Sequence, residues 1–289
     1  MHIILHFIKH KIIKPMKSIL NYIAPLLATA ALVTLSGCAS NQETRSIVVY
    51  YSASGATETV AKLIQEKTGA DMVEITPTVP YGGDFDAINE AFRKEMEKGV
   101  SREIEPLDVD FTKYDTVYVG TPVWYGRCAG PVETFLKTYS LKDKTVYPFC
   151  TFGSGGNTTA EMMKRLQPEA HIDDWYGVRN ARLDKAGEEL DRFLARIAAP
   201  KNALPQWPAF SGSKPLDEAE RAIFDEACGD YPMPLGTPVS VAFRDKGDVT
   251  EYLFETEATG FDGKPATQSI YVIKGKDDGS VAEFTQVVR

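Results

Sequence analysis

The sequence predicts an α/β protein with a doubly wound, five-stranded parallel sheet, followed by a small α+β domain. Three observations support this. Short, β-branched apolar runs alternate with amphipathic helical segments over residues 46–198, which is typical of a parallel sheet covered on both faces. A proline-rich stretch at 199–215 then breaks the pattern and indicates a linker. Residues 216–289 begin with one helical segment and continue with four strand-like runs.

The larger domain, 46–198, can be followed element by element. Its first strand is the run SIVVYY at 46–51, and Val60, Leu63 and Ile64 share one face of the helix expected over 57–67. Further strands are expected at 71–76, 116–120, 144–152 and, with a weaker pattern, 172–178; further helices are expected at 85–98, 131–139, 158–166 and 183–197. This alternation predicts the parallel sheet.

The smaller domain, 216–289, has one expected helix and four expected strands. They are placed at 216–228 and at 238–243, 249–255, 268–274 and 280–288, with turn-forming residues at 246–248 and 277–279. A helix lying across a four-stranded antiparallel sheet is the simplest packing of these elements. The layout faintly resembles the cystatin fold. The inhibitory Gln-Val-Gly signature of cystatins is absent, so no protease inhibition is inferred.

Charge argues against nucleic acid as a partner. The chain has 289 residues and a formal net charge of −8, and its first 37 residues hold four of the 32 basic residues and none of the 40 acidic ones. The remainder therefore carries a formal −12, where nucleic-acid binding would require a basic surface.

The N-terminal segment predicts export and lipid anchoring. Met16 and Lys17 precede the apolar run 19–33, and Leu35-Ser36-Gly37-Cys38 resembles the lipobox of bacterial lipoproteins. We expect a signal peptide over 1–37 with its start at Met16, a tether over 38–45, and lipidation of Cys38 that holds the protein to a bacterial membrane in the cell envelope. The alternative is an uncleaved transmembrane anchor.

Cysteines and histidines predict no metal site. Three cysteines follow the anchor, Cys128, Cys150 and Cys228, and an odd number cannot all pair. We expect each of them to pack as a small buried hydrophobe. His171 is the only histidine after the anchor.

A hydroxyl-rich loop follows the first strand and opens the first helix. Its candidate binding residues are Ser52, Ser54, Gly55, Ala56 and Thr57. Unpaired N–H groups and the helix dipole make such a terminus a phosphate site, and the absence of a lysine favours a single phosphate monoester over a nucleotide triphosphate. The alternative interpretation is helix capping by Ser54 and Thr57.

Two further loops follow the third and fourth strands. Their candidate binding residues are Pro122, Val123, Trp124, Tyr125 and Gly126 in one, and Gly153, Ser154, Gly155 and Gly156 in the other. Ligands of open parallel sheets lie beyond the carboxyl ends of the strands, so these loops should meet the phosphate loop. Trp124 or Tyr125 can present a flat face to a ring, and the alternative for both is packing.

These loops together resemble flavodoxins, over residues 46–198. The match is the hydroxyl-x-hydroxyl-Gly-x-Thr pattern of 52–57 and the positions of the other two loops. The resemblance implies strand order 2-1-3-4-5, FMN as cofactor, and flavin contacts from the second and third loops, with Trp124 favoured as the stacking ring. The third loop lacks an aromatic residue, which leaves the outer flavin face open or covered by Tyr81.

Three functions are compatible with this sequence. The first is an FMN-binding electron carrier outside the cytoplasm, which serves a redox partner protein or a small electron acceptor and turns over no substrate of its own. The second is an FMN-dependent NAD(P)H quinone or nitro reductase. The third is a flavin-free binding lipoprotein. Serine hydrolysis is poorly supported, because no G-x-S-x-G elbow exists. We assign no catalytic residue and no metal ligand.

Overall fold

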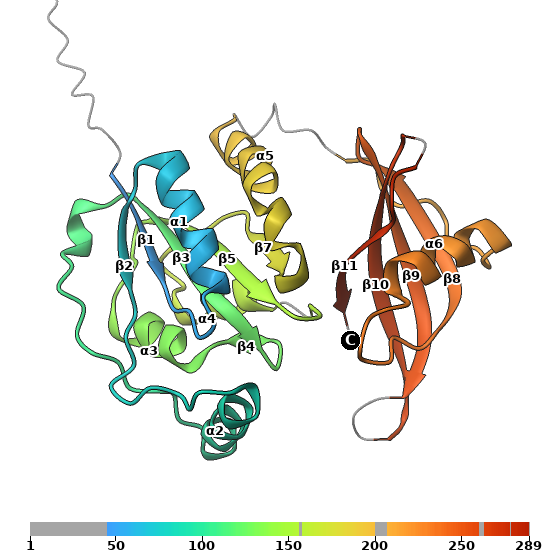
Figure 1. Cartoon of the computed structure of the whole chain (residues 1–289). Coiled ribbons are helices and arrows are strands. Elements are labelled where there is room, and N and C mark those ends of the chain that lie inside the picture. The colour runs from blue at the N-terminus through green and yellow to red at the C-terminus, as the bar shows by residue number, and fades with distance from the viewer. Residues whose placement is uncertain (1–44, 156–157, 200–206, 260–262, 278, 289) are drawn as a thin grey trace, which may run out of the picture. The chain divides into compact units, whose positions relative to one another are not determined.

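The computed structural model describes residues 45–155, 158–199, 207–259, 263–277 and 279–288, and it contains two β-sheets (Figure 1). The expected signal peptide, Cys38 with most of the tether, Gly156 and part of the expected linker lie outside the described residues.

The first sheet is parallel at its centre and has the strand order β2-β1-β3-β5-β6. Its strands are β1 (Ser46–Tyr50), β2 (Asp71–Glu74), β3 (Thr116–Trp124), β4 (Arg127–Cys128), β5 (Thr145–Phe152), β6 (His171–Ile172) and β7 (Tyr176–Arg179). The expected order is confirmed, with β5 as the fourth strand of the prediction. The single strand expected at 172–178 is instead two, because β6 pairs with the start of β5 and β7 with its end.

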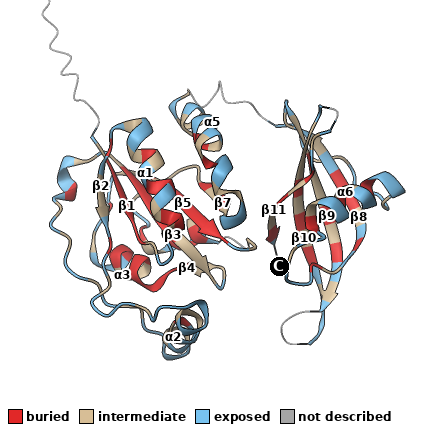
Figure 2. Cartoon of the chain, viewed as in Figure 1, coloured by how far each residue is buried: buried red, intermediate tan, exposed pale blue. Residues whose placement is uncertain are grey.

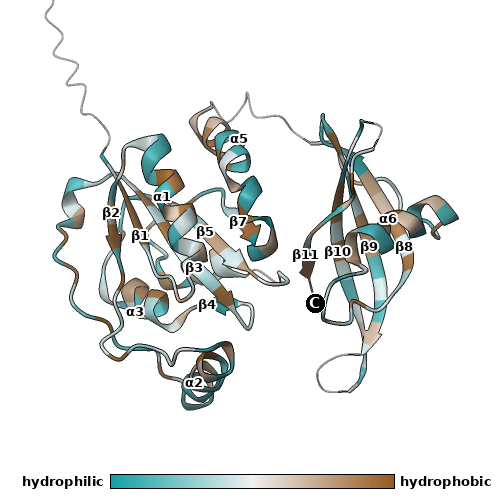
Figure 3. Cartoon of the chain, viewed as in Figure 1, coloured by the Kyte–Doolittle hydropathy of each residue, from teal (hydrophilic) through white to brown (hydrophobic). Residues whose placement is uncertain are grey.

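Helices cover both faces of this sheet. They are α1 (Ala56–Thr68), α2 (Phe85–Lys98), α3 (Gly130–Thr138), α4 (Thr159–Leu166) and α5 (Ala186–Ala198), with 3-10 turns at Phe111–Lys113 and Asn180–Lys185. Alternate residues of β1 point to opposite faces: Val48 packs with α1 and α5, while Val49 packs with α3 and α4. Buried residues run along β1 and β5 (Figure 2), and α1 interleaves hydrophilic with hydrophobic residues (Figure 3). The sheet is therefore doubly wound.

The second sheet is antiparallel with the order β11-β10-β9-β8. Its strands are β8 (Thr237–Asp245), β9 (Val249–Thr259), β10 (Pro265–Gly275) and β11 (Glu283–Val288), and helix α6 spans Glu218–Cys228. Phe224 and Cys228 of α6 are buried in one cluster with Val241, Phe254 and Val272 of the strands. The expected helix on a four-stranded sheet is confirmed.

Replacing Gly120 with alanine should destabilise the first sheet. A Cβ built at Gly120 lies 2.1 Å from Cζ of Phe149, whose ring is buried. Overpacking of this kind costs about 1–3 kcal/mol of unfolding free energy. Gly187→Ala is the matched control, because a Cβ at Gly187 meets no atom within 4 Å and lies in helix α5. Urea denaturation should show a loss for Gly120→Ala alone, and equal stability of the two variants would contradict this packing.

Candidate functional site

Three loops meet at the carboxyl ends of β1, β3 and β5, and hydrogen bonds connect them. The Tyr51 N–H donates to the Gly120 carbonyl across 3.1 Å, which joins the ends of β1 and β3. The Thr158 hydroxyl, at the start of α4, donates to the Gly126 carbonyl beyond β3. Parallel strands that share a sheet end together, so this convergence follows from the topology.

The loop after β1 leaves the start of helix α1 open. Gly55 occupies the N-cap position with φ 86°, and no side chain caps the helix within the described part of the chain. The Gly55 N–H instead donates to Oγ of Ser52 across 3.1 Å, and Ser54 is exposed. The capping role considered for Ser54 and Thr57 is therefore wrong, and no described side chain satisfies the first-turn N–H groups of this 13-residue helix as a cap.

This loop suits a phosphate group. A Cβ built at Gly55 meets no atom within 4 Å, so space lies open beside the helix start, and only glycine adopts this positive φ without strain. The exposed Ser54 hydroxyl and the N–H groups of Ala56 and Thr57 are donors at the positive end of the helix dipole. The donor set therefore matches a phosphate monoester.

Thr57 connects the first loop to the third. Its side chain is buried, and its hydroxyl shares a hydrogen bond of 2.8 Å with the buried hydroxyl of Thr151 near the end of β5. The two residues are 94 positions apart, so the sequence carried no signal for Thr151 as a site residue. The bond fixes the helix start against the central strands.

The second loop is a β-hairpin. Strand β3 continues past the expected end at residue 120, because Val123 and Trp124 pair with Cys128 and Arg127 of β4. Pro122 and Val123 are therefore strand residues, and Pro122 lies in register with Thr151 of β5. The turn consists of Tyr125 and Gly126, with φ of 50° and 71°, which is typical of a tight hairpin turn.

Tyr125 and Trp124 have different environments. The Tyr125 side chain is 59% exposed at the tip of the hairpin, in a left-handed conformation that a bulky residue seldom adopts. Trp124 packs edge-on against Tyr51, Tyr81 and Phe92, with ring centroids 5.9, 5.0 and 5.2 Å away. The structure therefore gives Trp124, which the sequence favoured as the stacking ring, a packing role, and it leaves the ring of Tyr125 accessible.

Tyr81 is held at the side of the site. Its hydroxyl donates to Glu95 of α2 across 2.6 Å, and the Arg102 guanidinium lies 3.9 Å from its ring centroid. Arg102 in turn pairs with Glu95 across 2.5 Å. These contacts hold the Tyr81 ring beside Trp124, whose ring centroid lies 5.0 Å away.

A pocket of about 340 Å³ lies beside the phosphate loop. Its lining includes Tyr51, Ser52, Glu74, Thr76 and Tyr81, and its size falls at the lower end of the range for small-molecule sites. None of its described lining residues comes from the loops after β3 and β5, so this pocket adjoins the site and is not the whole of it.

Among the described residues, Glu74 is the acidic residue that lines this pocket. Burial raises the pKa of Glu74, and the charge of Glu58 in the first turn of α1 raises it further. The sequence analysis did not identify Glu74, because a single carboxylate at a strand end carries no motif.

The third loop is held by a side chain of strand β7 and by the backbone of strand β11 in the second sheet. Arg179 of β7 donates from Nε to the Gly153 carbonyl across 3.0 Å, and the Val287 N–H of β11 donates to the Ser154 carbonyl across 2.7 Å. Gly155 adopts φ 112° and forms a bridge with Val287. No sequence motif indicated these contacts.

Thiol, histidine and metal chemistry are not supported at this site. Cys128 and Cys150 are fully buried, as expected, and burial raises the pKa of Cys150 to about 12. His171 lies at the start of β6, level with the start of β5 and so at the opposite end of the sheet. Among the described residues, no group of three or more His, Cys, Asp or Glu side chains could hold a metal ion.

None of the described helices has the length and apolar character that a membrane crossing requires.

Removing the Thr151 hydroxyl should destabilise the protein. Thr151→Val leaves the buried Thr57 hydroxyl without its partner, which costs about 1–3 kcal/mol of unfolding free energy. The double variant Thr57→Val with Thr151→Val should recover part of this loss, because neither hydroxyl then remains unpaired. Urea denaturation of the two single variants and the double variant checks this, and strictly additive losses would contradict a direct bond.

The first domain is similar to known proteins. The flavodoxin family model matches residues 45–189. Similar solved structures include a candidate flavoprotein of Bacteroides eggerthii (25% identity, 54% of this chain and 99% of that chain covered, TM-score 0.46). Others are a flavoprotein of Lactobacillus acidophilus in complex with FMN (23%, 49% and 97%, 0.41) and oxidised flavodoxin 2 of Bacillus cereus (16%, 53% and 99%, 0.34). No curated protein matches the chain. With its family model covering half of its length, the chain belongs to the flavodoxin family.

Proposed function

We propose that this protein binds FMN on the three loops and serves as an electron carrier, anchored by lipid to a bacterial membrane outside the cytoplasm. The observation that carries the proposal is the start of helix α1 at Gly55, which no described side chain caps and which follows the carboxyl end of β1. The flavodoxin family match over residues 45–189 supports it. A relative from Lactobacillus acidophilus was crystallised with FMN, which supports the choice of cofactor.

The phosphate of FMN would be held by the loop after β1. Ser54 offers its exposed hydroxyl, and the backbone of Ala56 and Thr57 offers N–H groups at the helix start. The Ser52 hydroxyl oxygen accepts a hydrogen bond from the Gly55 N–H, which holds Gly55 in place. These neutral donors need no lysine, because the helix dipole supplies the positive potential.

The ring of FMN would lie between the second and third loops. Tyr125 can stack on one face, and Gly153 and Ser154 can present backbone groups to the polar edge. When bound, FMN supplies the ability to accept and release electrons singly or in pairs. The residues of this chain hold the ring at the surface, where an acceptor can approach Tyr125 at the hairpin tip.

Charge near the site favours a carrier that resists full reduction. Asp84 and Asp86 are exposed at the start of helix α2 and form no ion pair with another described residue, whereas Glu90 and Glu97 further along the helix are paired with Arg93. Phe92 of the same helix packs against Trp124 and Tyr125. Nearby negative charge makes the gain of a further negative charge unfavourable.

The carrier and the reductase differ in what they consume. FMN-loaded protein should consume little NADPH or NADH in the presence of a quinone, and once chemically reduced it should pass electrons to a haem protein such as cytochrome c. Rapid, sustained oxidation of NADPH or NADH with quinone would overturn the carrier role and favour the reductase. A protein that takes up no FMN would favour the flavin-free binding lipoprotein.

Replacing Cys38 with serine should abolish lipidation. The sulfur of Cys38 is the acceptor in the lipobox Leu35-Ser36-Gly37-Cys38, so Cys38→Ser leaves no group to receive the lipid. Metabolic labelling with a radioactive fatty acid should mark the wild type and not the variant, and uncleaved precursor should accumulate. Undiminished label on Cys38→Ser would rule out this anchor.

A further inference from the structure

The loop after β5 is paired with the edge of the second sheet. Both belong to one compact unit formed by Glu43–Arg289. Strand β11 is the edge strand of the order β11-β10-β9-β8, so no other described strand pairs with one side of its backbone. Val287 uses that side to donate its N–H to the Ser154 carbonyl across 2.7 Å, and Gly155 forms a parallel bridge with Val287. An exposed strand edge is covered in this way.

The approach of the two segments requires a glycine. A Cβ built at Gly155 lies 2.8 Å from both N and O of Val287, and Gly155 has φ 112°. Both features exclude an ordinary side chain at this position. The loop backbone and the strand backbone are therefore in direct contact.

Arg179 joins the same two segments with its side chain. Its Nε donates to the Gly153 carbonyl across 3.0 Å, and its Nη1 donates to the Phe284 carbonyl of β11 across 2.8 Å. The guanidinium lies 4.1 Å from the Phe284 ring centroid. One cation thus bonds the loop and the strand at once.

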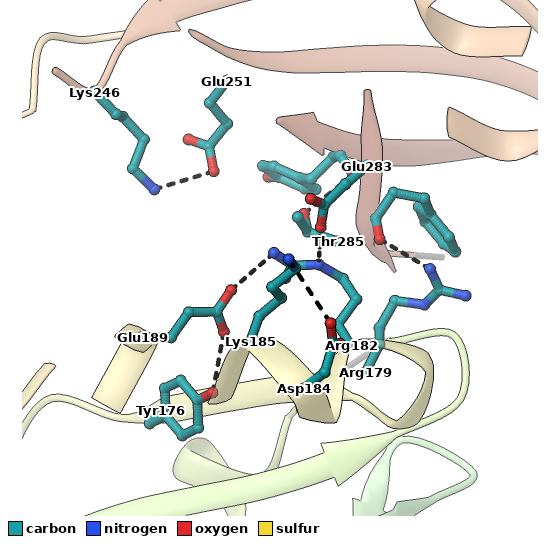
Figure 4. A network of polar contacts seen from close by, with 12 residues as sticks. Tyr176, Arg179, Arg182, Asp184, Lys185, Glu189, Lys246, Glu251, Glu283 and Thr285 are labelled. Carbon is teal, nitrogen blue, oxygen red and sulfur yellow. Dashed lines mark hydrogen bonds and ion pairs between the residues drawn. The ribbon is translucent and has the colours of Figure 1, made fainter. Parts of the chain in front are cut away.

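A second arginine links the strand to the larger domain. Arg182 donates from Nε to Glu283 of β11 across 2.7 Å, and it pairs with Glu189 of α5 across 2.8 Å. Glu189 also accepts from the Tyr176 hydroxyl (Figure 4). The Arg182 side chain is only 12% exposed, so this pair is screened far less than a surface pair.

These contacts fix a loop that is intrinsically loose. Gly153 and Gly155 give the backbone more freedom than other residues would, and fixing it at the moment of binding would cost affinity. Because the carbonyls of Gly153 and Ser154 are already hydrogen-bonded, the loop backbone is ordered before a ligand binds.

We propose that strand β11 is a clamp that holds the backbone of 153–155 in the conformation that receives the flavin. This rests on the proposed FMN site. Because the coupling between two binding events is reciprocal, FMN should also strengthen the docking of β11. Arg179, Arg182 and Glu283 are positioning residues in this arrangement, since each acts on the loop through the strand or through a loop carbonyl.

The test compares two arginine variants of the full-length chain. Arg179→Gln removes the bonds to loop and strand, and we expect FMN affinity to fall about tenfold. Arg196→Gln is the matched control, because the Arg196 pair with Asp174 does not involve β11. Hydrogen exchange of residues 283–288 is the second readout. It should accelerate in Arg179→Gln, stay unchanged in Arg196→Gln, and slow down in the wild type when FMN is added.

Glu283→Gln tests the clamp from the side of the strand. Glu283 has no place in the proposed flavin site, so weaker FMN binding in this variant can arise only through docking. Faster exchange of 283–288 with unchanged FMN affinity, in Glu283→Gln or Arg179→Gln, would overturn the clamp. A wild type that binds no FMN would overturn the proposed function and with it the coupling. Exchange in the two variants would then still report whether β11 docks as described.

Discussion

FMN should bind this protein at least a hundredfold more tightly than riboflavin, which lacks only the phosphate. Each hydrogen bond to a charged group contributes about 1.5–3 kcal/mol, and the open start of α1 offers at least two N–H donors together with the Ser54 hydroxyl. Two such bonds correspond to a factor of about a hundred or more. Quenching of flavin fluorescence on titration with each compound measures the ratio.

Variants in the loop should reduce this selectivity. Ser54→Ala removes one donor and should weaken FMN about tenfold or more while leaving riboflavin unchanged. Ser213→Ala, an equally small change at an exposed serine distant in the chain, should alter neither affinity. Equal affinity of the wild type for FMN and riboflavin would remove the phosphate assignment to this loop.

Alanine at Trp124 and at Tyr125 should affect two different properties. Trp124→Ala removes a ring that contacts Tyr51, Tyr81 and Phe92, and should lower the unfolding free energy by about 3 kcal/mol. Tyr125→Ala removes an exposed ring and should leave stability nearly unchanged. If Tyr125 stacks on the flavin, its loss should weaken FMN about ten- to a hundredfold, by the scale of aromatic stacking on nucleobases.

Tyr125→Phe is the control for the stacking role, because it keeps the ring and removes only the hydroxyl. It should retain FMN affinity within about twofold. Flavin titration and urea denaturation of the three variants separate the two roles. Loss of affinity in Trp124→Ala at unchanged stability, with Tyr125→Ala unaffected, would return the stacking role to Trp124, as the sequence alone had favoured.

Local sequence signals predicted most of the first domain. Helix α2 lies where it was expected, at 85–98, because Asp84 accepts a bond from the Ala87 N–H at its start and Gly99 adopts φ 66° at its end. Strand β3 is longer than predicted. The prediction missed the hairpin that extends it, because the turn at Tyr125 and Gly126 places a tyrosine in a left-handed conformation. Turn propensity does not favour tyrosine at such a position.

The candidate site was only partly predictable, because several of its contacts join distant residues. The open start of α1 follows from a local motif, whereas the bond from Thr57 to Thr151 and the pairing of Gly155 with Val287 depend on the assembled fold. The packing of Trp124 likewise depends on Phe92 of helix α2, which is distant from it along the chain. Sequence patterns indicate local structure along the chain, and they do not predict which distant residues come into contact.

The presence of bound FMN is the most direct test of this account. Residues 39–289 should be purified without added flavin, and the visible absorption spectrum recorded before and after saturation with FMN. We expect a yellow protein that releases one FMN per chain on denaturation, identified by mass, or a colourless one that takes up one equivalent of FMN. A protein that is colourless as purified and neither absorbs nor quenches added FMN would contradict the proposed function.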